Sequence, residues 1–330
     1  MNLKDIIFSL FKYKSPEKHN FVLLEDDESD KSSNSSQSIK NDTNIPETKN
    51  IFPALSVNLE YVKTKYNSMI NSDIIIREFT LNARGKQYSA FILYIDGMIN
   101  TDIMNKFILE PLMLKNRSNM FDGEQNRIIS EAVTNNITVR KVKKFDLSEY
   151  ILGCLMPQNS VEQYSEFEKI FNDINSGNCA LFIDTLTIAF DIDVKGFKQR
   201  SVERPQNEIV INGAHEAFVE NIRTNTSLLR RNVHNENLII ENFSIGKITK
   251  TPSALCYVQN IANSDLVDEV RYRLNNIEVD SLLSTGQLEQ LIIDSNIMDI
   301  PQVLSTERPD KASGYLLDGR IIVLVNGTPY

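Results

Sequence analysis

The stretch from Lys195 to Arg231 places the tightest limits on how this chain folds. It begins as a charged connection that runs to Pro205, a residue that biases its predecessor away from helix. Glu208 to Ile211 predict a short buried strand, and Asn212-Gly213 predicts the turn that ends it. The residues that follow predict a helix of about five turns with one buried stripe. That stripe comprises Phe218, Ile222, Thr226 and Leu229, at spacings of three and four.

The interior of this predicted helix contradicts its own propensity. Thr224 to Ser227 are poor helix formers, each roughly 0.5 kcal/mol less favourable than alanine. Such conflicts gather where a sequence serves a site or an interface. Three interpretations stay open: a satisfied polar cluster in the core, a contact with another subunit, or a ligand site. The candidate contact residues on this element are Glu220, Arg223, Asn225, Arg230 and Arg231.

Length and charge narrow the class of protein. A chain of 330 residues is long enough for two compact units and a tail. A net charge of −9 argues against a nucleic-acid partner, which needs a basic face. The three cysteines are far apart in apolar stretches, as in a reducing compartment. Because no apolar run approaches the ~18 residues of a membrane span, we expect a soluble region on the cytoplasmic side.

Residues 1–51 are predicted to be a disordered tail. Glu25 to Asn50 contain almost no apolar residues, so this stretch cannot offset the entropy of ordering. Met1 to Lys14 leave two alternatives open, a frayed terminus or a short helix on a membrane surface.

Residues 52–200 predict an α/β subdomain. Ser56 is expected to cap a helix whose inner face holds Leu59, Val62, Tyr66 and Met69. Ile74 to Leu81 and Tyr88 to Ile95 predict a hairpin. Further expected elements are a helix from Asn100 or Thr101 interrupted at Pro111, strands at Ile137–Val142 and Tyr150–Leu155, a helix capped by Ser160 and Gln163 that ends at Gly177, and strands at Cys179–Ile183 and Leu186–Ile192.

Residues 201–330 predict a second α/β subdomain, so the fold class is α/β in the mixed α+β sense, with a mixed sheet flanked by helices in each subdomain. Beyond the central helix, the expected elements are strands at Leu238–Ile245 and Ser253–Val258, helices from Asn263 or Ser264, from Ser284 or Thr285 and from Pro309 to Asp318-Gly319, and a strand at Ile321–Val325. The pair Asn326-Gly327 predicts a hairpin whose return strand lies beyond Tyr330. We therefore expect the soluble front of a longer protein.

The sequence gives no sign of catalytic chemistry. It has no glycine-rich phosphate loop, and His19, His215 and His234 lack the spacing of metal ligands. We expect no enzyme activity, cofactor or metal. One charged group invites comparison with the central helix, namely Glu307, Arg308 and Asp310 around a turn. These charges are either solvated or paired with the charges of the central helix, where arginine forms bidentate bonds with carboxylates.

Several short motifs give the chain a family resemblance. They are Ser201–Gln206, Gly213, Phe218–Asn221, Arg223–Thr226, Gly246-Lys247, Thr249–Thr251, Ile261–Asn263, Pro301-Gln302, Thr306–Lys311, Leu317–Arg320 and Val325–Pro329. In this order they resemble the GerA family, the A subunits of the nutrient receptors of spore germination. The resemblance is close from Asp146 to Tyr330 and looser from Phe52 to Arg140. One departure is Asn212-Gly213-Ala214, where the family pattern favours Arg-Gly-Pro.

The resemblance implies a role in signalling and assembly without chemistry. It implies a cytoplasmic region of a receptor A subunit at the inner spore membrane, on the spore-core side. It also implies B and C subunits and further A subunits as partners, and a membrane region after Tyr330. Two alternatives stay open: a small nutrient bound in the cleft between the subdomains, or an enzyme whose site is not legible in the sequence.

Overall fold

The computed structural model describes residues 49–83, 86–113, 146–157, 160–196, 205, 207–208, 210–294 and 301–330. The predicted strand Ile137–Val142 and the segment Met1–Lys14 lie outside these residues. In the first half of the chain the elements are α2 (Leu55–Lys65), β1 (Ile74–Ala83), β2 (Lys86–Ile95), α3 (Thr101–Met104), the π-helix η1 (Asn105–Leu109), α4 (Glu110–Met113), α6 (Leu147–Tyr150), the π-helix η3 (Ile151–Leu155), β3 (Val161–Tyr164), α7 (Phe167–Asn175), β4 (Cys179–Ile183) and β5 (Ala189–Ile192). In the second half they are α8 (Ile222–Asn232), β6 (Leu238–Ile245), β7 (Thr251–Val258), α9 (Ser264–Asn275), α10 (Thr285–Ile292), α11 (Pro309–Leu317) and β8 (Ile322–Val325).

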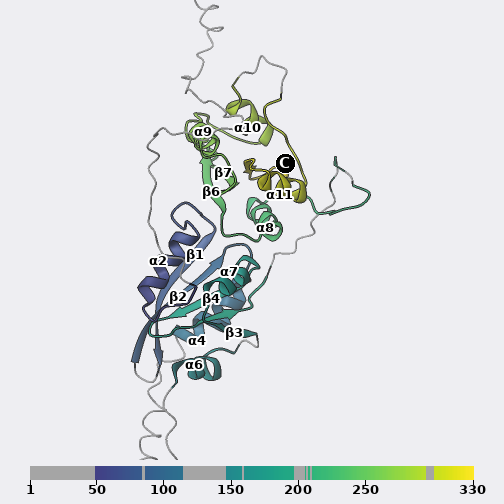
Figure 1. The fold of residues 1–330 in the computed structure, drawn as a ribbon. Coiled ribbons are helices and arrows are strands. Elements are labelled where there is room, and N and C mark those ends of the chain that lie inside the picture. Colours follow the sequence, from purple (N-terminus) through teal and green to yellow (C-terminus); the bar gives the residue numbers. More distant parts are fainter. Residues whose placement is uncertain are drawn as a thin grey trace, which may run out of the picture. The chain divides into compact units, whose positions relative to one another are not determined.

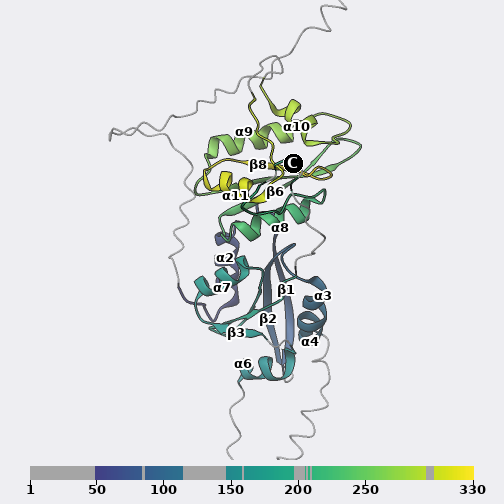
Figure 2. The ribbon, with the colours of Figure 1, turned by 90° about the vertical axis from the view of Figure 1, so that its right-hand side faces the viewer.

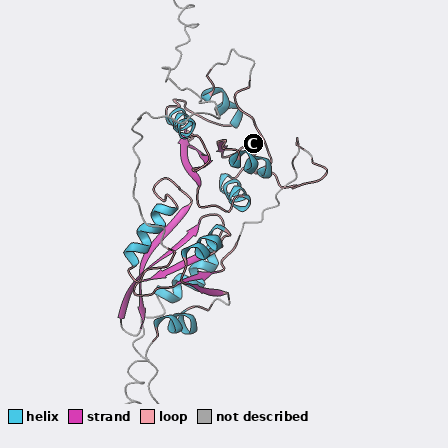
Figure 3. Ribbon diagram, viewed as in Figure 1, coloured by secondary structure: helices cyan, strands magenta, loops and turns pink. Residues whose placement is uncertain are grey.

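The described strands form two sheets (Figure 3), in keeping with the expected mixed α and β fold. One has the order β1-β2-β4-β5-β3 and the other the order β6-β7-β8. Every pairing in both sheets is antiparallel, where mixed sheets were expected. For three of the pairings the reason is local: β1–β2, β4–β5 and β6–β7 are joined by short turns, and a short turn joins only antiparallel strands.

Helices cover both faces of the five-stranded sheet (Figures 1 and 2). On one face α2 and α7 pack on Phe91, Leu93 and Phe182. On the other, α3, η1, α4, α6 and η3 pack on Ile92, Leu181 and the strands beside them. The side chains of successive strand residues point to opposite faces, so strands covered on both faces are apolar along their length.

The fold begins earlier than Phe52. Lys49 to Ile51 lie antiparallel to Ser165–Phe167: the Ile51 N–H donates to the Ser165 carbonyl at 2.8 Å, and the Phe167 N–H donates to the Lys49 carbonyl at 3.0 Å. Ile51 is buried in the core beside α2 and α7. The last residues of the predicted tail therefore belong to the fold.

Several local predictions for the first half are wrong. Tyr150–Leu155 is helical rather than a strand, and Pro111 lies inside α4 without ending the helical run. Val161–Tyr164 is a strand, so the predicted helix at Ser160 begins only at Phe167. The first turn of α2 is bonded by a residue from another part of the chain, since the Leu55 N–H donates to the Asp184 carboxylate at 3.2 Å.

The second sheet also has helices on both faces. Leu238, Ile240, Ala254 and Cys256 pack with α8 and α11. Ile239, Leu255 and Tyr257 pack with α9 and α10 on the other face. The predicted N-caps Asn263 and Ser284 accept hydrogen bonds from the first turns of α9 and α10.

The central helix is shorter than its sequence pattern predicts. Ala214 to Asn221 are irregular, and α8 starts at Ile222 with Asn221 as its cap. Phe218 is buried as predicted, but from the irregular segment rather than from the helix. The predicted strand Glu208–Ile211 is absent from its described residues, and Ile211 is 92% exposed. Asn221 caps this shorter helix, while Thr226 and Leu229 of the predicted stripe are buried as expected.

Candidate functional site

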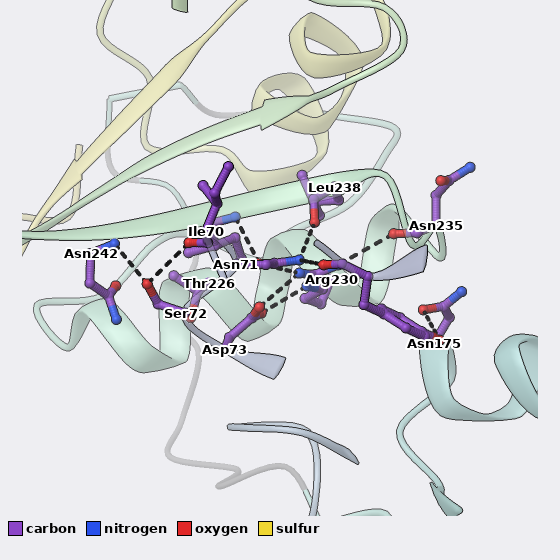
Figure 4. A network of polar contacts seen from close by, with 12 residues as sticks. Ile70, Asn71, Ser72, Asp73, Asn175, Thr226, Arg230, Asn235, Leu238 and Asn242 are labelled. Atoms are coloured by element: carbon purple, nitrogen blue, oxygen red, sulfur yellow. Dashed lines mark hydrogen bonds and ion pairs between the residues drawn. The ribbon is translucent and has the colours of Figure 1, made fainter. Parts of the chain in front are cut away.

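A three-residue segment joins the first sheet region to the edge of the second sheet (Figure 4). Asn71 uses its side-chain amide as a strand backbone would: its Oδ1 accepts from the Ile240 N–H at 3.0 Å and its Nδ2 donates to the Leu238 carbonyl at 3.1 Å. The Ser72 N–H donates to the Ile240 carbonyl at 2.8 Å, and the Ser72 hydroxyl accepts from the Asn242 N–H. The outer edge of β6 is therefore satisfied from Leu238 to Asn242.

Arg230 completes this junction, which we call the coupling site and define as Asn71, Ser72, Asp73 and Arg230. The Nε and Nη2 of Arg230 donate to the two Asp73 carboxylate oxygens, each at 2.8 Å (Figure 4). Nη2 also donates to Asn71 Oδ1 at 3.2 Å, and Nη1 donates to the Asn235 carbonyl. Arg230 is 1% exposed and Asp73 is 8% exposed. A bidentate pair with further hydrogen bonds is the arrangement in which a buried charge is compensated.

More exposed contacts surround the coupling site. Arg223 pairs with Asp96, which follows β2. The Asn67 amide donates to Gln259 at 2.5 Å. Glu236 pairs with Lys65 at 3.0 Å and accepts from Asn175 at 3.5 Å. Each of these contacts joins an element of the first sheet region to α8 or the second sheet region.

Asn225 explains the unfavourable residues inside α8. It is 1% exposed, and its amide accepts from the Val219 N–H at 2.8 Å and donates to the Val219 carbonyl at 2.6 Å. Ser227 and Thr226 bond back to the Arg223 carbonyl. These contacts favour the first of the three interpretations, a satisfied polar cluster in the core. A role in subunit or ligand contact stays a prediction.

Glu307 holds the segment that enters the second half of the chain. Glu307 is 5% exposed, and its carboxylate accepts from the N–H groups of Asn207 and Glu208. The Glu307 carbonyl accepts from the Phe218 N–H at 2.8 Å. Two segments that lie about a hundred residues apart in the sequence therefore meet in the structure.

The neighbouring charges pair locally. Lys311 donates to Glu208 at 2.7 Å, and Thr306 donates to the same carboxylate. Burial raises the pKa of Glu208, but the bonds from Lys311 and Thr306 outweigh it and hold that pKa below its usual range. Arg308 lowers the pKa of Asp310 by pairing with it.

Of the two alternatives left open for these charges, pairing with the central helix is not seen among the described contacts. Arg308 binds Asp310 rather than a residue of α8, and Glu307 binds backbone groups. Arg231 pairs with Glu216 at 3.2 Å. Glu220 uses its backbone carbonyl to accept from the Gly327 N–H at 2.7 Å.

A cleft of about 740 Å³ lies next to the coupling site. Met69, Ile70 and Ser72 line one side, and residues of β6 and the end of α9 line the other. Its charged wall is Glu241 with Arg271, whose Nε donates to Glu241 at 2.8 Å. Tyr257 donates to the same carboxylate at 2.7 Å, and burial with this bond raises the tyrosine pKa.

Among the described residues, no helix combines the length and apolar character that crossing a membrane requires. The same residues contain no cluster of three histidine, cysteine or carboxylate side chains suited to a metal ion.

Sequence reasoning missed Asn71, Ser72, Asp73 and Asp96. The first three form a polar gap between a helix and a strand, and such gaps are usually plain loops. Their partners lie on elements more than a hundred residues later, so no local rule connects them.

Comparison with known proteins places the chain in a family. The profile of the family described as GerA, Bacillus/Clostridium GerA spore germination protein, matches residues 60–330. Spore germination protein KA of Bacillus subtilis (strain 168) is 30% identical over 280 residues, which is 85% of this chain and 46% of that protein. Spore germination protein B1 of the same organism is 32% identical over 260 residues, with 79% and 48% covered. The chain spans about half the length of these relatives.

A solved structure has the same fold. It is the N-terminal domain of the A subunit of the Bacillus megaterium spore germinant receptor GerK3, with a TM-score of 0.57 and 29% identity. The alignment covers 86% of this chain and 95% of that domain. The two-sheet fold is thus similar to that of a germinant-receptor A-subunit N-terminal domain. The chain belongs to the GerA spore germination protein family, which confirms the resemblance in its sequence.

Proposed function

We propose that this chain is the part of a spore germinant-receptor A subunit that couples nutrient sensing to germination through contacts rather than chemistry. It works with B and C subunits, and with further A subunits, at the inner spore membrane. This region lies on the spore-core side and continues into a membrane region. The observation that carries the proposal is the coupling site, where a buried arginine joins two sheet regions.

The geometry of α8 supports a role in transmission. At its start, the Ile222 N–H donates to the Asn326 side chain at 3.2 Å, close to the end of the described chain. Near its end, Arg230 binds Asp73 before β1. Arg223 binds Asp96 after β2. A rigid element with partners on both sides passes a displacement from one side to the other, provided both sides bias its position.

The exposed pair tests this proposal more cleanly than the buried one. Arg223 is 54% exposed, so Arg223→Ala and Asp96→Ala should change the free energy of unfolding by less than about 1 kcal/mol. In spores that carry the full-length receptor, both variants should germinate more slowly with nutrient. Germination is followed by the fall in optical density, and receptor abundance by immunoblot.

Arg231→Ala is the matched control. Arg231 lies on the same helix but pairs with Glu216 of the second half, so its variant should germinate normally. The swapped pair Arg223→Asp with Asp96→Arg should restore part of the response. Normal germination of Arg223→Ala and Asp96→Ala at parental receptor abundance would refute coupling through this contact.

A second candidate function is nutrient binding in the cleft beside the coupling site. Its volume lies within the 300–1,000 Å³ typical of small-molecule sites, and both sheet regions line it. Amino acids and sugars are the ligand classes to test, because the lining mixes polar side chains such as Asn242 with apolar ones such as Phe243.

The test is the melting temperature of this chain against a panel of amino acids and sugars. A ligand at a hundred times its Kd stabilises the folded state by about 2.7 kcal/mol, which raises the melting temperature measurably. Ser244→Trp should fill the cleft and abolish that rise. A panel without any rise, up to millimolar concentrations, would contradict nutrient binding by this region.

A further inference from the structure

A buried carboxyl group that takes no part in the coupling site lies in the five-stranded sheet, towards the end where β1 begins and β2 ends. Asp191 is on β5 and is 5% exposed, and Asn178, just before β4, is 6% exposed. The Asn178 Nδ2 donates to Asp191 Oδ2 at 2.5 Å. The other oxygens of the pair, Asp191 Oδ1 and Asn178 Oδ1, are buried without a hydrogen-bond partner.

These contacts match a carboxylic acid paired with a primary amide, except that the proton of the acid is missing. A carboxylic acid and a primary amide form two hydrogen bonds side by side, one N–H to O and one O–H to O. Here the first bond is present, and each group has one acceptor oxygen left over. Two buried acceptors without donors are costly, and a single proton on Asp191 would satisfy both.

The charges around the pair do not favour an anion. Glu162 of β3 lies directly opposite Asp191 in the sheet, and Asp173 of α7 faces the same side. Lys195, which follows β5, is the cation near the pair, and it is exposed. Cys179 of β4 is buried, and burial together with the charge of Asp191 raises the pKa of its thiol.

We propose that Asp191 carries a proton in the folded chain near neutral pH and that the proton closes the pair by an O–H bond from Asp191 Oδ1 to Asn178 Oδ1. The proton comes from solvent and no other bond changes. The pair is therefore a pH-sensitive latch. Loss of the proton leaves a buried anion with one donor and releases the turn before β4.

The latch lies next to the connection between the sheet regions. Gly177 is so close to Met98 and Lys195 that an added Cβ would lie 3.3 Å from the Met98 carbonyl oxygen. Ile99 forms an isolated antiparallel β-bridge with Lys195, and the Gly196 N–H donates to the Met98 carbonyl at 3.2 Å. A loosened turn at Asn178 therefore affects the point where the chain leaves the first sheet.

The direction of the pH effect follows from the two states. Burial, with the charges of Asp173 and Glu162, raises the pKa of Asp191 to about 7, although the bond from Asn178 opposes the shift. In the unfolded chain an aspartate has a pKa of about 3.9. Between these values the folded state holds more protons than the unfolded state, so stability falls as the pH rises from about 4 to about 7.

The experiment compares Asp191→Asn with the parent chain. Asparagine keeps the shape and supplies the N–H donor that the acid supplies when protonated. The ratio of the unfolding equilibrium constants, parent over variant, is measured by urea denaturation between pH 5 and pH 8. It should rise at least about tenfold across that range. Asp184→Asn, at the turn between β4 and β5, should run parallel to the parent.

A direct measurement covers the case in which Asp191→Asn does not fold. The carboxyl ¹³C resonance of Asp191 in the parent chain should titrate near neutrality. Hydrogen exchange of the Asn178 and Gly196 amides should accelerate as that resonance moves. A resonance that titrates below pH 5, or a ratio of unfolding constants that stays flat with pH, would overturn the proposal.

Discussion

Arg230 donates two parallel hydrogen bonds, each 2.8 Å long, to the two carboxylate oxygens of Asp73, which lies 157 residues earlier in the chain. Both side chains are buried, so the pair is shielded from solvent and salt. The pair fixes how α8 lies against the start of β1. Replacing one partner leaves the other as an uncompensated buried charge.

Arg230→Met should therefore lower the free energy of unfolding by about 3–5 kcal/mol. Arg231→Met is the control, and its effect should stay within about 0.5 kcal/mol because its partner Glu216 is exposed. Urea denaturation measures both. Adding Asp73→Leu to Arg230→Met should recover much of the loss, since the orphaned charge is then gone. Equal effects of the two arginine substitutions would show that the buried pair contributes no more to the free energy of unfolding than the exposed pair.

Asn225→Ala should cost about 1–3 kcal/mol, because it removes the buried amide that bonds both the N–H and the carbonyl of the half-buried Val219. Thr224→Ala, one position earlier and half-buried, should cost less than about 1 kcal/mol. Thermal unfolding of the two variants beside the parent decides the matter. If Asn225→Ala melts with the parent, the polar cluster is not structural and the subunit-contact prediction gains weight.

Removal of residues 1–48 should leave the melting temperature unchanged to within about 2 °C, whereas removal of residues 1–52 should lower it. The longer cut deletes the pairing of Lys49–Ile51 with Ser165–Phe167 and the buried Ile51 side chain. Burying an isoleucine side chain contributes about 1.5–3 kcal/mol. Differential scanning calorimetry of the two truncated chains makes the comparison. Identical melting curves would place Ile51 outside the cooperative core.

Thr185→Gly should stabilise the chain by about 0.5–1 kcal/mol. Thr185 has a φ of +74°, a left-handed conformation that costs a branched residue roughly 1–2 kcal/mol and costs glycine little. Part of this stabilisation is lost, because glycine raises the conformational entropy of the unfolded chain. Thr187→Gly, at an exposed position without a positive φ, should destabilise by a similar amount. Stabilisation by both or neither would count against backbone strain at Thr185.

Much of the fold could be predicted from the sequence, because periodic patterns and helix caps are local signals. The β1–β2 hairpin, both strands around Asp184-Thr185 and the caps of α9 and α10 follow from neighbours in the chain. Predictions failed where a contact from elsewhere decided the outcome. The pattern from Phe218 to Leu229 suits a single helix, but Asn225 and Glu307 hold Val219 and Phe218 in an irregular segment instead.

Only part of the candidate site could be predicted from the sequence, for the same reason. Arg230 stood out by its place on the central helix, but its burial could not be predicted without Asp73. A charged residue is expected at the surface unless its partner is known. Three ordinary polar residues after a helix gave no sign that they would meet β6.

The amide of Asn71 and the backbone of Ser72 occupy the outer edge of β6. An uncovered strand edge invites pairing with other chains, and proteins usually block it. The edge of the second sheet is therefore covered by residues from a distant part of the sequence. A shorter protein made from residues 205–330 alone would present a bare row of backbone donors and acceptors, and we expect it to self-associate. Work that divides this region should keep Asn71 to Asp73 attached to the piece that contains β6.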